Sequence, residues 1–106
     1  MPKYLFQASY SSDGTKGLLK EGGTQRVTNL EKTLQGIGGK LETFYYAFGD
    51  SDVVGIAELP DNVTAAALSL TINASGMGNV KTTVLMTPAE IDQAAKKSVS
   101  YRAPGR

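Results

Sequence analysis

The sequence contains neither cysteine nor histidine among its 106 residues. Without cysteine, disulfide bonds, thiolate nucleophiles and zinc–thiolate sites are excluded. Without histidine, the chain lacks the commonest general base, the usual haem ligand and the main ligand of transition metals. No metal site and no cofactor are therefore expected. Covalent hydrolase chemistry is disfavoured, because no Ser-x-x-Lys pattern offers a lysine base to a serine nucleophile.

Strong charge and long apolar runs are also missing. The formal net charge is +1, from 11 basic and 10 acidic residues, so nothing points to nucleic acid or an anionic membrane as a partner. No apolar run is long enough to span a bilayer. The N-terminus, Met1 to Tyr4, leads directly into a strand pattern, with no signal peptide ahead of it. We therefore expect a cytoplasmic protein of one domain.

The most informative segment runs from Leu41 to Pro60. Residues 41–48 and 53–59 are rich in aromatic and β-branched side chains, and Gly49-Asp50-Ser51-Asp52 separates them. Two such runs joined by turn-forming residues predict a β-hairpin with a short loop. Pro60 ends the second run, because proline cannot donate to a β-ladder.

Helical patterns lie on both sides of this hairpin. Residues 15–21 predict one or two helical turns, and a main helix is predicted from an N-cap at Thr24 to a stop at Gly38-Gly39. A further helix is predicted after Asp61 or Asn62. Apolar residues recur at helical spacing in both long helices. They are Val27, Leu30, Leu34 and Ile37 in the first, and Val63, Ala67, Leu70 and Ala74 in the second.

Strands are predicted at both ends of this series, over residues 4–10 and 79–86. Thr87-Pro88-Ala89-Glu90 then forms a capping-box pattern that predicts a short final helix. The order β-α-β-β-α-β with a C-terminal helix predicts an α+β, ferredoxin-like fold. Residues 1–97 would form the single domain, and residues 98–106 a polar tail.

Both faces of the predicted hairpin strands carry apolar side chains. In the first strand, Phe44, Tyr46 and Phe48 would share one face, and Leu41, Tyr45 and Ala47 the other. An antiparallel sheet that is exposed on one side normally alternates apolar and polar residues. We therefore predict a homodimer or higher oligomer in which a second copy covers the helix-free face.

These residues resemble the GYD-domain family, a small bacterial family. The resemblance runs through almost the whole chain, and the segments that carry it include Gly38-Gly39-Lys40-Leu41-Glu42, Phe48-Gly49 and Leu85-Met86-Thr87-Pro88. It implies a dimeric α+β-barrel-type fold with a suspected pocket, and it implies no established activity. The family's Gly-x-Tyr-Asp turn is Gly49-Asp50-Ser51-Asp52 here, so serine stands where tyrosine is usual.

Five residues form the candidate ligand-binding site, between the sheet and the helices or at the open mouth of that space. They are Tyr10, Arg26, Glu42, Tyr45 and Asp52. Asp50 and Asp52 are an acid–base pair, a hard-metal site or ordinary turn residues. The tyrosines either donate to a ligand or only pack with their hydroxyls in water. Gly22 to Arg26 either binds an anion at free N–H groups or is a plain helix cap.

Two function classes remain. In the first, the protein binds a small organic ligand or serves a structural or regulatory role. The alternative is a cofactor-independent enzyme, of the oxygenase or isomerase type, acting on an aromatic or polyketide-like molecule. In that case Asp52 or Glu42 would act as the base. A cavity with a buried carboxylate would favour the enzyme.

Overall fold

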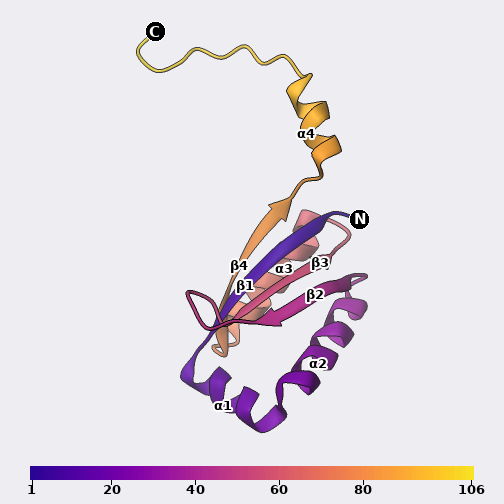
Figure 1. The fold of residues 1–106 in the computed structure, drawn as a ribbon, viewed down its shortest axis with the longest axis vertical. Coiled ribbons are helices and arrows are strands. Elements are labelled where there is room, and N and C mark those ends of the chain that lie inside the picture. The colour runs from indigo at the N-terminus through magenta and orange to yellow at the C-terminus, as the bar shows by residue number, and fades with distance from the viewer.

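The computed structural model describes residues 1–106 and has the predicted α+β, ferredoxin-like fold (Figure 1). Its sheet is antiparallel throughout, with the strand order β2-β3-β1-β4. The elements in chain order are β1 (Lys3–Tyr10), α1 (Ser12–Glu21), α2 (Gly23–Gly36), β2 (Lys40–Tyr46), β3 (Val53–Glu58), α3 (Asn62–Ala74), β4 (Gly78–Leu85) and α4 (Pro88–Ala95). None of the helices combines the length and apolar character that a membrane crossing requires.

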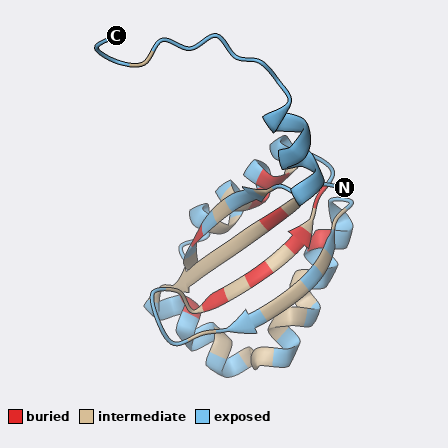
Figure 2. Ribbon diagram, turned by 45° about the horizontal axis from the view of Figure 1, so that its top comes forward, coloured by how far each residue is buried: buried red, intermediate tan, exposed pale blue.

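The core lies between one face of the sheet and the helices α2 and α3. Burial alternates along β3, where every second residue is buried (Figure 2). Tyr4 of β1 pairs with Ala57 of β3 and is fully buried, and its hydroxyl donates to Asn62 Oδ1 at 2.6 Å. The buried cluster consists of Tyr4, Leu34, Ala57, Leu59, Ala65 and Leu68. Strands β1 and β3 therefore form the centre of both the sheet and the core.

Helix α3 packs through a different stripe from the one predicted. The buried residues are Ala65 and Leu68, with Ile72 packed against the cluster, whereas Val63 and Leu70 are 80% and 71% exposed. Apolar residues occupy most of the circumference of this helix, so periodicity alone does not select one face. The packing against the sheet decides it instead. At its start the Asp61 carboxylate accepts the Thr64 N–H, which lowers the pKa of Asp61.

Strand β2 departs from simple alternation. Its register with β3 shifts between Leu41 and Thr43, so a β-bulge lies at Glu42. The extra residue moves Leu41 to the helix-covered face, where it packs against the core. The predicted grouping of Leu41 with Tyr45 and Ala47 is therefore wrong. The strand also ends earlier than predicted, and Phe48 in the hairpin loop is fully exposed.

The segment between β1 and β2 contains more helix than predicted, because α1 and α2 follow each other almost directly. Helix α1 begins at Ser12, because Ser11 Oγ accepts the Gly14 N–H at 3.1 Å and acts as the N-cap. Gly22 has φ +91° and donates its N–H to Leu18 O, which ends α1. The next helix starts at Gly23, so the predicted N-cap at Thr24 is wrong. Glycine is needed at position 22 because this φ is strained for residues with a Cβ.

Helix α4 and the tail project from the domain as an arm (Figure 1). The predicted capping box is present: Thr87 Oγ1 accepts the Glu90 N–H, and Glu90 Oε1 accepts the Thr87 N–H. All residues of α4 are exposed, so the helix adds nothing to the core. The arm accounts for the elongated extents of 56 × 32 × 23 Å. The proposed boundary between domain and tail at residue 97 stays a prediction.

Because α4 does not pack on the domain, its N-cap should affect the stability of this helix alone. Thr87→Ala is expected to destabilise this helix by about 0.5–2 kcal/mol, because the cap hydroxyl is lost. The free energy of global unfolding should not change, since α4 is not packed on the domain. Amide hydrogen exchange in residues 88–95 and urea unfolding measure the two effects separately. A Thr87→Ala variant with lower global stability would show that the arm is packed in solution.

Candidate functional site

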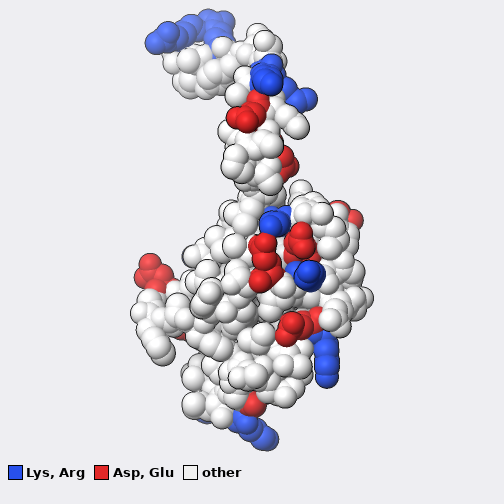
Figure 3. Space-filling view, turned by 45° about the vertical axis from the view of Figure 1, so that its right-hand side comes forward, with Lys and Arg blue, Asp and Glu red and all other residues white.

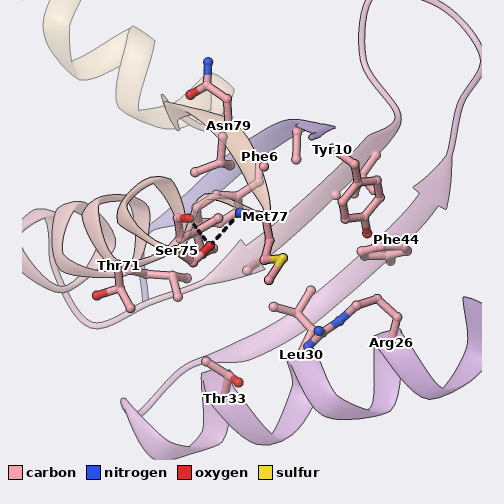
Figure 4. A pocket seen from close by; sticks show the side chains of 18 of the residues that line it. Phe6, Tyr10, Arg26, Leu30, Thr33, Phe44, Thr71, Ser75, Met77 and Asn79 are labelled. Carbon is pink, nitrogen blue, oxygen red and sulfur yellow. Dashed lines mark hydrogen bonds between the residues drawn. The ribbon is translucent and has the colours of Figure 1, made fainter. Parts of the chain in front are cut away.

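A cavity of about 390 Å³ lies between the helix-covered face of the sheet and the helices α2 and α3. It exists because the two helices cover the same face yet make little contact with each other. Most of its lining is apolar (Figure 4). The sheet contributes Phe6, Ala8, Val53, Gly55, Ala57 and Val80, and the helices contribute Leu30, Leu34, Leu68 and Ile72. The volume falls within the range of about 300–1,000 Å³ that is common for small-molecule sites.

The polar end of this cavity contains Arg26 and Tyr10, two of the five predicted site residues. Arg26 lies in the first turn of α2 and extends toward the cavity (Figure 4). Its Nε is 3.4 Å from Glu21 Oε1. Arg26 is the only charged residue in the lining. The cavity therefore has one cationic point on an otherwise uncharged wall.

Two phenols lie near this guanidinium. Burial raises the pKa of Tyr10, and the neighbouring Tyr46 adds to the rise, while the positive charge of Arg26 opposes it. Burial also raises the pKa of Tyr46, again against the effect of Arg26. Both phenols are therefore protonated at neutral pH and can act as hydrogen-bond donors. The Tyr46 hydroxyl donates to Gly23 O at 2.9 Å, whereas the Tyr10 hydroxyl makes no hydrogen bond within the chain.

Asp52 supports the site without lining it. Its Oδ2 accepts the Tyr10 N–H at 2.8 Å, and its own N–H donates to Ala8 O at 2.8 Å. These bonds fix the end of β1 to the start of β3, as the central pairing of those strands predicts. Asp50 lies in the exposed hairpin loop, where its carbonyl accepts from Ser9 Oγ. The chain holds no group of three or more acidic residues arranged as metal ligands.

The other two predicted residues lie on the opposite face of the sheet. The bulge turns Glu42 outward, where its Oε1 pairs with Lys3 Nζ at 2.5 Å. Tyr45 pairs with Val54 and is 70% exposed. The adjacent Tyr46 faces the helices, as expected for at least one of the two tyrosines. The structure thus brings Tyr10, Arg26 and Asp52 to one end of the cavity and separates Glu42 and Tyr45 from it.

Several cavity residues were not anticipated from the sequence. They are Thr33, Thr71, Ser75, Met77 and Asn79. Thr33 and Thr71 lie next to the core residues Leu34 and Ile72 in the sequence, and that adjacency was the available signal. Met77 enters the lining through the turn between α3 and β4. Because Met77 lies in a loop, no helix or strand periodicity in the sequence indicates that it faces the cavity.

Comparison with known proteins identifies the family. A search among curated proteins and a search among solved structures each give no match. The family model described as GYD domain matches residues 4–95 of the 106-residue chain. That range runs from the second residue of β1 to the end of α4 and includes every residue of the cavity lining. The chain therefore belongs to the GYD domain family.

Proposed function

We propose that the protein binds a small, largely apolar organic molecule in the cavity between the sheet and the helices. The supporting observation is the cavity itself, which separates α2 from α3 beside a buried cluster of only six residues. Closer approach of the two helices would bury more apolar surface, so an empty cavity costs the domain stability. A ligand with an apolar body recovers that burial.

The enzymatic alternative has less support. A general base must lie within hydrogen-bond reach of the proton that it removes. No carboxylate is among the cavity residues, since Asp52 is bonded to the Tyr10 N–H and Glu42 lies on the other face. Binding without chemistry is therefore the function that we propose.

We also infer that the protein is a homodimer formed through the helix-free face of the sheet. Leu5 and Ile56 pair on this face, with Val54 and Leu85 nearby, and all four side chains are partly exposed. Its polar residues include both signs, with Lys3, Glu58 and Lys81 on the strands. Acidic and basic side chains lie next to one another on the domain surface (Figure 3). A surface with both signs suits a second copy of itself.

The binding proposal predicts that filling the cavity abolishes binding. N-phenyl-1-naphthylamine, a neutral apolar fluorophore, should bind the parent protein saturably, with one site per chain. Ala8→Leu places a larger side chain on the cavity wall, and its affinity should fall by about tenfold or more, since several apolar contacts are lost. Thermal unfolding should show that the variant remains folded.

Ala66→Leu is the matched control, because it makes the same change at an exposed position of α3. It should bind the fluorophore as the parent does. If the parent shows no saturable binding, or if the two variants bind alike, the cavity is not a ligand site.

A further inference from the structure

We propose that the ligand of this cavity carries one carboxylate, which Arg26 and Tyr10 bind while the apolar part of the ligand fills the space between α2 and α3. This inference rests on the proposed binding function and adds the chemical class of the ligand. The ligand would be an amphipathic monocarboxylate, of the kind that an aliphatic or aromatic acid provides.

The hydrogen bonds of the cavity residues leave few groups free for a ligand. Thr33 Oγ1 donates to Asn29 O, and Thr71 Oγ1 donates to Ala67 O within its own helix. Ser75 Oγ donates to Ile72 O and accepts the Met77 N–H (Figure 4). Three of the hydroxyls that line the cavity are therefore committed to backbone groups.

Arg26 and Tyr10 are different. The Nε of Arg26 faces Glu21, and no hydrogen bond within the chain involves the terminal nitrogens of its guanidinium. The Tyr10 hydroxyl is a protonated donor without a partner. Both side chains extend toward the same end of the cavity (Figure 4). A guanidinium offers two parallel N–H donors that match the two oxygens of a carboxylate, and the phenol adds a third donor.

The nearby carboxylates do not fill this role themselves. Glu21 Oε2 accepts from Asn29 Nδ2 at 2.9 Å, which holds the side chain against α2 and outside the cavity lining. Asp52 accepts the Tyr10 N–H at 2.8 Å. Glu21 pairs with the Nε of Arg26, and the terminal nitrogens of the guanidinium have no partner within the chain. These terminal N–H groups match the two oxygens of one carboxylate, so we expect a single acidic group on the ligand.

The test compares two probes with the same chain length, decanoate and decan-1-ol, as competitors of N-phenyl-1-naphthylamine near neutral pH. In the parent protein, decanoate should displace the fluorophore at a concentration about tenfold or more below that of decanol, because only the carboxylate forms an ion pair with the guanidinium through two oxygen acceptors. Arg26→Gln should remove this preference and leave the affinity for decanol within about twofold. Tyr10→Phe should weaken decanoate alone, by about threefold or more.

Lys20→Gln is the control for net charge, because it removes an exposed cation at the end of α1. It should keep the preference for decanoate. Equal displacement by the two probes in the parent would overturn the inference, as would an equal loss of preference in Arg26→Gln and Lys20→Gln. These outcomes differ from failure of the binding proposal, in which the fluorophore and both probes do not bind.

Discussion

Replacing Gly14 by alanine is expected to destabilise the domain by about 1–3 kcal/mol, although alanine is the better helix former. Gly14 is buried in the first turn of α1. A Cβ at this position would lie 1.8 Å from the carbonyl oxygen of Met77. That oxygen accepts the Ser11 N–H at 3.0 Å, so it belongs to the junction between α1 and the start of β4. The added methyl group must displace backbone there, and the cost exceeds the gain in helix propensity.

Gly17→Ala provides the matched control within the same helix. Nothing lies within 4 Å of a Cβ at Gly17, so the substitution should stabilise the domain by about 0.5–1 kcal/mol. Urea unfolding of the two variants beside the parent measures both values. The close contact between Gly14 of α1 and Met77 in the turn before β4 would be absent in solution if both variants gained stability.

The features that could be predicted from the sequence are those determined by local chemistry. Alternation from Tyr4 to Tyr10 predicted β1, and the turn residues around Gly49 predicted the hairpin. The Thr87 capping box predicted the start of α4, which both of its hydrogen bonds confirm. Because the order of these elements permits few ways to pair the strands, the fold followed from them.

The features that were missed depend on tertiary packing or on a single inserted residue. The bulge at Glu42 reverses the faces of the residues before it, and no turn residue or proline marks it in the sequence. In α3, the stripe through Ala65 and Leu68 was as regular as the predicted stripe through Val63 and Leu70. Packing against the sheet determines which of the two stripes is buried, and the sequence pattern contains no information on that packing.

The same distinction applies to the candidate site. Tyr10 and Asp52 were expected to meet because β1 and β3 are neighbours at the centre of this fold, and the hydrogen bond between them confirms it. Glu42 and Tyr45 were included because β2 borders β3, but strand adjacency does not determine which face a side chain occupies. The cavity depends on the separation of α2 from α3. The distance between the two helices cannot be predicted from the spacing of apolar residues in either of them.

The assembly proposal predicts that one charge on the helix-free face converts a dimer into a monomer. Ile56 lies on β3, opposite Leu5 of β1, on that face. In a dimer through this face, Ile56→Asp would bury an unpaired carboxylate in each copy. The cost of desolvating the two carboxylates would exceed the association free energy of the remaining contacts. Light scattering at micromolar concentration should give the mass of two chains for the parent and of one chain for the variant.

Val63→Asp makes a similar change on the outer face of α3, where the side chain is 80% exposed. It should leave the dimer intact, because this position faces away from the sheet. Circular dichroism establishes that both variants are folded, so that a change in mass reports assembly alone. A parent protein that is monomeric, or a folded Ile56→Asp variant with the mass of a dimer, would refute the assembly. The helix-free face would then have no second copy to cover Leu5 and Ile56, and these side chains would remain in contact with water.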